Sequence, residues 1–130
     1  MQEQRSIEQL ENDYWKDVDF PSSLVERCFN YRKVPVSDLS VEQLRLLIGQ
    51  KIGLRYTVPK AIALLQADIL AEGDYYPGDL LNSLLSFSED DWNVCPAEKT
   101  KFMELLHQNI SLIEASENKE LIRNVKAYLS

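Results

Sequence analysis

The hydrophobic positions of this chain recur at the spacing of an α-helix, and the most apolar segment runs over residues 58–71. The residues at intervals of three or four are Val58, Ile62, Leu65 and Ile69. Alanine and leucine fill most of the remaining circumference, and a helix that is apolar on nearly all sides belongs in the middle of a bundle. We therefore predict a central helix over 58–71, with Thr57 as its N-cap and Pro59 in its first turn.

Amphipathic segments on both sides of this helix predict further helices. A serine followed three residues later by Glu, Gln or Asp marks a helix start, because the two residues cap each other's main-chain N–H groups. This pattern occurs at Ser23 with Glu26, Ser40 with Gln43 and Ser88 with Asp91. Other helices are expected from Ser6 to near Trp15, over 79–85, over 97–115 and after Ser116, which we expect to cap the last helix. No alternating strand pattern is long enough to predict a sheet.

These patterns predict an all-α fold, a compact helical bundle of about six to eight helices around the central helix over 58–71. At 130 residues the chain is expected to form a single domain, residues 1–130, that buries roughly two-thirds of its unfolded surface. The polar N-terminus does not resemble a signal peptide, and no segment is long enough to span a membrane. We therefore expect a cytoplasmic protein with no membrane partner, in which Cys28 and Cys95 are reduced.

Acidic residues are concentrated in one part of the chain, and this changes the expected partner. The net charge is −7, and the interval between Lys60 and Lys99 contains eight Asp or Glu and no Lys or Arg. The rest of the chain is close to neutral, with 14 Lys or Arg against 13 Asp or Glu. Binding to nucleic acid requires a basic surface that contacts the phosphates, and this chain lacks such a surface in its sequence pattern. The distribution predicts a basic protein partner instead.

Catalytic and metal-binding patterns are not found in the sequence. His107 is the only histidine, and no second strong metal ligand lies at a workable spacing from it. Neither cysteine shows the electropositive signature of a reactive thiol, and the glycines at 49 and 53 do not match a phosphate-binding loop. We predict a protein that is not an enzyme and that has no catalytic residues, no cofactor and no metal.

Two acidic segments are candidates for contact with a partner. The first combines two adjacent tyrosines with carboxylates: Glu72, Asp74, Tyr75, Tyr76 and Asp79. Aromatic rings within a polar rim are typical of protein interfaces, although one tyrosine could instead pack on the central helix while the other shields it. The second segment is Glu89, Asp90 and Asp91, directly before Trp92. These acids could cap a helix, form a partner surface or, least in keeping with the pattern, bind a metal or act in catalysis.

Several motifs in combination resemble a known family. They are L-R-L-L-I-G-Q-K-I-G-L from Leu44, V-P at Val58, I-L-A-E-G-D-Y-Y-P-G-D-L-L from Ile69, L-E-x-x-Y-W from Leu10 and L-V-x-x-C from Leu24. Together they are similar to bacterial immunity proteins of contact-dependent growth inhibition (CDI) systems. The similarity runs from about Leu10 to Leu85 and fades over the C-terminal third.

The resemblance implies a small all-helical protein that binds and neutralises the C-terminal toxin domain of a CDI effector in the cytoplasm. It also implies that the toxin is a nuclease, most often a ribonuclease, but it carries no set of binding residues to this chain. We expect the two acidic segments together, Glu72 to Asp79 and Glu89 to Asp91, to occlude the toxin's basic active-site cleft. Binding beside the active site is the other geometry, and a monomer is the expected state of the free protein.

Two other functions are compatible with the composition. A helical adaptor or regulator could use the same acidic surface to bind an endogenous basic protein, with no toxin involved. A small enzyme could use the acidic cluster with a metal ion. A large effector gene directly upstream would favour the immunity function, and a metal titration would test the enzyme.

Overall fold

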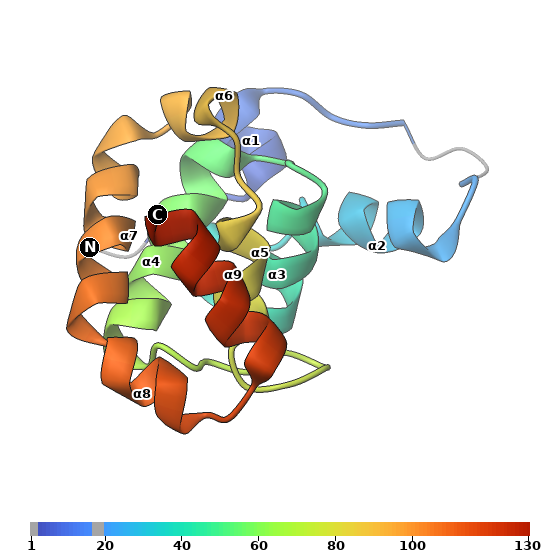
Figure 1. Cartoon of the computed structure of the whole chain (residues 1–130). Coiled ribbons are helices and arrows are strands. Elements are labelled where there is room, and N and C mark those ends of the chain that lie inside the picture. Colours follow the sequence, from blue (N-terminus) through green and yellow to red (C-terminus); the bar gives the residue numbers. More distant parts are fainter. Residues whose placement is uncertain (1–2, 17–19) are drawn as a thin grey trace.

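The computed structural model describes residues 3–16 and 20–130, and in this part of the chain it confirms the all-α prediction (Figure 1). Within the described residues there are nine α-helices, and six of them have seven residues or more, which agrees with the expected bundle. The elements are α1 (Ile7–Glu11), α2 (Ser23–Tyr31), the 3-10 helix η1 (Val36–Asp38), α3 (Val41–Gly49), α4 (Leu54–Ala67), α5 (Asp79–Leu85), α6 (Glu89–Asn93), α7 (Pro96–Gln108), α8 (Ile110–Ala115) and α9 (Lys119–Leu129). None of these helices is both long and apolar enough to cross a membrane.

Helix α4 is the centre of the bundle, as the apolar pattern predicts (Figure 1). It packs against α3 on one side and α7 on the other, and Val58, Ile62 and Leu65 have almost no exposed surface. Its predicted bounds are wrong, because the helix covers 54–67 rather than 58–71. Gly53 starts the helix early by adopting a left-handed conformation with φ 61°, which glycine adopts without steric cost. The main chain becomes extended at Asp68, so residues 69–71 continue as a loop.

This shift also corrects two residue assignments at the start of α4. Thr57 is fully buried inside the helix and is not its N-cap, because Gly53 occupies that position. Pro59 lies in the second turn, where the missing N–H removes one intrahelical hydrogen bond.

The other helix starts are partly as predicted. Capping boxes form at Ser6, Ser40 and Ser88. The predicted box at Ser23 is wrong: Ser22 is the N-cap of α2, and its hydroxyl accepts the Val25 N–H at 3.2 Å. Ser116 is likewise not the cap of the last helix, because the Asn118 side chain accepts the Leu121 N–H.

Two predicted helices end earlier than expected. The first stops at Glu11, well before Trp15, because Asn12 adopts a left-handed conformation with φ 51°. The helix predicted over 97–115 is divided at Asn109 into α7 and α8. At this point both the main-chain N–H and the side-chain amide of Asn109 donate to the Leu105 carbonyl oxygen, at 3.1 and 2.9 Å.

An aromatic cluster joins the C-terminal helices to the rest of the bundle. Phe102 of α7 has no exposed surface, and its ring lies 5.3 Å from the Trp92 ring of α6 and 5.4 Å from the Tyr128 ring of α9. Phe87 in turn packs edge-on against Trp92 at 4.9 Å. The cluster fixes α6, α7 and α9 relative to one another, and it thereby supports α5, which packs against α9.

Candidate functional site

The loop between α4 and α5, residues 68–78, displays most of the predicted acid and tyrosine side chains. It is the yellow-green segment below α3 and α5 in Figure 1. Glu72, Asp74 and Tyr75 are exposed, Tyr76 is half-buried, and Asp79 at the start of α5 is buried. The loop therefore presents three carboxylates, those of Asp68, Glu72 and Asp74, and one exposed aromatic ring to solvent.

Asp79 lies beneath this loop rather than on its surface, with an exposed fraction of 4%. Its carboxylate accepts hydrogen bonds from the N–H groups of Gly73 at 2.7 Å, Tyr75 at 3.1 Å and Tyr76 at 3.5 Å. A carboxylate that collects several main-chain donors fixes the path of the chain around it. Asp79 therefore holds the loop in place, and any contribution to partner binding is indirect.

A second carboxylate beneath the loop, half-buried and not indicated by the sequence, comes from α3. Glu42 accepts the Asp74 N–H at 2.9 Å and pairs with Arg45 through two hydrogen bonds of 2.7 and 2.6 Å. The Arg45 guanidinium also lies 4.0 Å from the Asp79 carboxylate and 4.6 Å from the centre of the Tyr75 ring. One cation thus balances the buried Asp79 and the half-buried Glu42 carboxylates, and it supports the exposed ring.

Gly73 allows the loop to approach these carboxylates closely. A Cβ atom at this position would lie 2.5 Å from Glu42 Oε1 and 3.1 Å from Asp79 Oδ2. Any side chain would therefore push Glu42 away from the loop.

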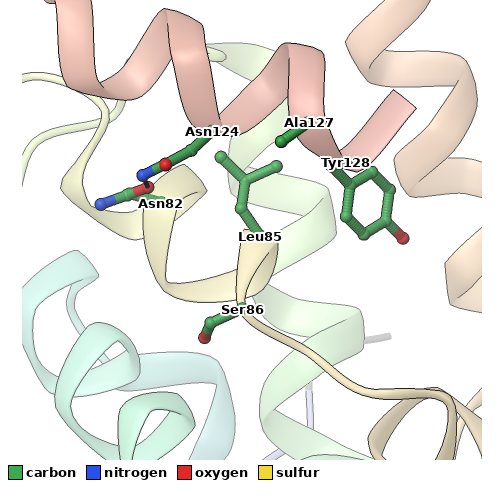
Figure 2. Close-up of a pocket in the computed structure, with 6 residues that line it drawn as sticks. All are labelled: Asn82, Leu85, Ser86, Asn124, Ala127 and Tyr128. Carbon is green, nitrogen blue, oxygen red and sulfur yellow. Dashed lines mark hydrogen bonds between the residues drawn. The ribbon is translucent and has the colours of Figure 1, made fainter. Parts of the chain in front are cut away.

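Tyr76 ties the other side of the loop to α5 and α9. Its hydroxyl oxygen accepts a hydrogen bond from Asn82 Nδ2 at 2.8 Å. The side-chain oxygen of Asn82, Oδ1, in turn accepts one from Asn124 Nδ2 at 2.9 Å. Figure 2 shows Asn82 and Asn124 facing each other from these two helices, at the edge of a groove of about 510 Å³. Tyr76 is thus part of a polar chain, and only Tyr75 projects freely.

The second acidic segment forms α6, which lies at the opposite end of α5 from the loop (Figure 1). Asp91 accepts the Ser88 N–H at 2.9 Å and pairs with Lys51 at 3.1 Å, which confirms the capping interpretation for this residue. Glu89 pairs with Lys99 at 2.9 Å, while Asp90 is exposed. The structure therefore does not gather the eight predicted residues into one cluster.

The Glu42 carboxylate is expected to make stability depend on pH. Its pKa lies below the ordinary value of 4.5 because Arg45, and to a smaller extent the Asp74 N–H, bonds the charged form. The unfolded chain therefore takes up this proton first as the pH falls. The stabilisation is complete above about pH 4.5 and is lost as the pH drops through the folded-state pKa.

Urea unfolding at about pH 6 and about pH 3.5 measures this effect. We expect Glu42→Gln to lose less free energy of unfolding between the two conditions than the unaltered protein does. Equal losses in the two proteins would contradict the assignment of this carboxylate.

The described residues also show where the other reactive side chains lie. Within 3–16 and 20–130, no three His, Cys, Asp or Glu residues are grouped so that they could hold a metal ion. His107 is exposed on α7, and both cysteines are free and buried. Burial, with a contribution from Glu98, raises the pKa of the Cys95 thiol to about 11, so this thiol stays protonated at neutral pH.

A helical scaffold whose surface carries a pre-ordered acidic loop is that of a binding protein. Comparison with known families agrees: the family model of CDI immunity proteins matches residues 9–102. The chain belongs to this family, and the resemblance drawn from the sequence motifs is confirmed. No curated protein and no solved structure matches the chain.

Family membership settles the general function. CDI immunity proteins are non-enzymatic inhibitors that act inside the cell, so the chain neutralises a cognate CDI toxin and is not an enzyme. It also favours the immunity function over the adaptor and the metal-dependent enzyme. The matched residues include α3, α4, the loop at 68–78, α5 and α6, whereas α8 and α9 lie beyond them.

Proposed function

We propose that this immunity protein neutralises a nuclease toxin, specifically a ribonuclease, by covering its basic active-site cleft with the acidic loop. The observation that carries the proposal is the position of the charge: the interval between Lys60 and Lys99 holds eight acids and no base, and the loop exposes Glu72 and Asp74 within it. An enzyme that cleaves RNA must hold a polyanion, and its cleft is therefore basic. Carboxylates that face such a cleft attract it over a long range and replace the phosphates.

We rank the eight predicted residues by their exposure, as a proposal for how directly each contacts the toxin. Glu72, Asp74, Tyr75 and Tyr76 belong to the contact surface, while Asp79 supports it from below. Glu89 and Asp90 of α6 lie one helix length away, about 10 Å along α5. An interface of standard size, about 800 Å² on each partner, can include both segments. We therefore place the loop at the centre of the interface and α6, with Asp91 as its cap, at the rim.

The proposed complex contains one immunity protein and one toxin domain, and it forms in the cytoplasm. The free protein is proposed to be a monomer, needing neither metal nor nucleic acid. Light scattering after size-exclusion chromatography tests this stoichiometry, with one peak at the summed mass of the two chains as the expected result. A higher-order complex would contradict it.

The proposed activity is tested by expressing the C-terminal domain of the CDI effector encoded beside this chain, alone and together with the chain. We expect the toxin domain alone to stop growth and degrade cellular RNA, and co-expression to restore growth and intact RNA. Degradation of DNA with intact RNA would overturn the ribonuclease assignment. Failure of the two purified proteins to associate would overturn the proposal as a whole.

A further inference from the structure

Tyr75 is a free aromatic side chain held in a fixed position. Among the described residues, the exposed large hydrophobic side chains are Tyr14, Tyr75, Val94 and Leu112, and Tyr75 is the most exposed at 69%. One face of its ring lies on the Arg45 guanidinium, with 4.6 Å between the ring centre and Cζ, while the remainder of the side chain faces solvent. A tyrosine supported in this way offers a large contact area and loses little rotational freedom on binding.

The main chain around Tyr75 is fixed by hydrogen bonds that point into the protein. From Gly73 to Asp79 every main-chain N–H is paired, and Pro77 has none. The acceptors are the Asp79 and Glu42 carboxylates and the carbonyl oxygens of Leu70 and Tyr76. This stretch of main chain therefore has no N–H left to donate. It can offer a partner only acceptors and the tyrosine side chains, which suits a surface rich in Arg or Lys donors.

Glu42 is the link between this loop and the body of the protein. Its side chain is mostly covered, with an exposed fraction of 14%, so it cannot form a large contact with a partner. It bonds the Asp74 N–H directly, and it holds Arg45 in the orientation that supports the Tyr75 ring. Replacing it by Gln would break the charged pair with Arg45, while the amide oxygen could still accept the Asp74 N–H and the exposed carboxylates would stay in the loop.

We propose that Tyr75 is the anchor residue of the toxin interface, and that Glu42 is a positioning residue that acts through it. The inference rests on the proposed function in one respect, namely that the loop at 68–78 faces the toxin. The partner chemistry is a cationic groove, in which Arg or Lys side chains lie along the Tyr75 ring and hydrogen-bond its hydroxyl group. Such buried aromatic anchors carry a large share of the binding energy of protein interfaces.

The anchor is tested by comparing two exposed tyrosines in binding to a catalytically inactive form of the neighbouring effector's C-terminal domain. We expect Tyr75→Ala to weaken binding by about 30-fold, mainly through faster dissociation, with an unchanged thermal midpoint. Tyr14→Ala is the matched control, because Tyr14 is also exposed but lies after α1, and it should stay within about twofold of the unaltered protein. Equal toxin affinity of the two variants would overturn the proposal that Tyr75 is the anchor residue.

The positioning role is tested by a double-mutant cycle. Glu42→Gln keeps the shape of the side chain and should weaken toxin binding by about tenfold, whereas adding it to Tyr75→Ala should cause no further loss. A residue that only stabilises the fold, or that attracts the toxin directly, would give additive effects instead, and additivity would overturn the role.

A glycine pair tests the same role without removing any charge. Gly73→Ala places a Cβ 2.5 Å from Glu42 Oε1, so it should weaken toxin binding as Glu42→Gln does. Gly49→Ala is the control, because a Cβ there meets nothing within 4 Å. Unchanged toxin binding by Gly73→Ala would contradict the role of Glu42.

Failure of the anchor can be distinguished from failure of the proposed function. Replacement of Glu72 and Asp74 by lysine reports whether the loop faces a basic surface at all. If that change weakens binding while Tyr75→Ala does not, the proposed function stands and the anchor is wrong. If neither change weakens binding, the loop does not face the toxin and both proposals fail.

Discussion

Replacing Glu72 and Asp74 together by lysine should weaken toxin binding by about 100-fold at low ionic strength, chiefly through slower association. The change raises the net charge by four units. Because both side chains are exposed, it leaves the Glu42 and Asp79 carboxylates beneath the loop undisturbed. Surface charges separated by more than about 10 Å are screened at 0.1 M salt, so the association rate of the variant should also depend less on salt. Stopped-flow association at several salt concentrations measures both effects.

A matched variant distinguishes local attraction from net charge. Asp38 and Glu104 are exposed and lie outside the acidic interval, on η1 and α7, and replacing both by lysine causes the same change in net charge. We expect this variant to associate within about threefold of the unaltered protein. Comparable slowing in both variants would show that the toxin responds to the overall charge rather than to the loop. Asp79 is unsuitable for such a test, because reversing a buried charge would disturb the fold itself.

Phe102→Ala should destabilise the protein by about 3–5 kcal/mol, the largest loss expected from a single change here. The ring has no exposed surface and lies between Trp92 and Tyr128, so its removal leaves a cavity where three helices meet. Loss of that packing also loosens α9 and, through it, the support of α5. Urea unfolding gives the free energy, and the thermal midpoint should fall by about 10 °C or more.

The comparison for this change is Leu112→Ala on α8, where the side chain is more than half exposed. That variant should stay within about 0.5 kcal/mol of the unaltered protein, as substitutions at exposed positions usually do. A Phe102→Ala variant as stable as Leu112→Ala would mean that the aromatic cluster does not fix the C-terminal helices.

The apolar pattern was sufficient to find the central helix, because Val58, Ile62 and Leu65 are buried on the surfaces that contact its neighbours. It could not place the ends of that helix. These depend on the conformations of Gly53 and Asp68, one left-handed and one extended, and both conformations are decided by how the chain must turn to reach the next element. The division of the long C-terminal helix at Asn109 was missed for a similar reason. A single side chain that bonds back to Leu105 has no periodic signature.

In the candidate site, too, the sequence pattern predicted some features and could not predict those that depend on tertiary packing. The acidic interval and the paired tyrosines indicated the loop, and the exposure of Glu72, Asp74 and Tyr75 agrees with that expectation. The burial of Asp79 and the role of Glu42 were not predictable. Both follow from the packing of α3 against α5, which brings residues more than 30 positions apart into contact. In the sequence, Glu42 and Arg45 look like an ordinary surface ion pair at helical spacing.

The hydrogen bond between Asn82 and Asn124 has a consequence for the design of truncated forms of this protein. Asn124 belongs to α9, which lies past the last residue of the matched family segment, yet it closes the polar chain that holds Tyr76. A clone designed to stop at residue 102 would keep the acidic loop and the bond from Asn82 to Tyr76, but it would lose the Asn124 side chain that holds Asn82. We therefore expect a working inhibitor to require residues beyond the stretch 9–102 that identifies the family.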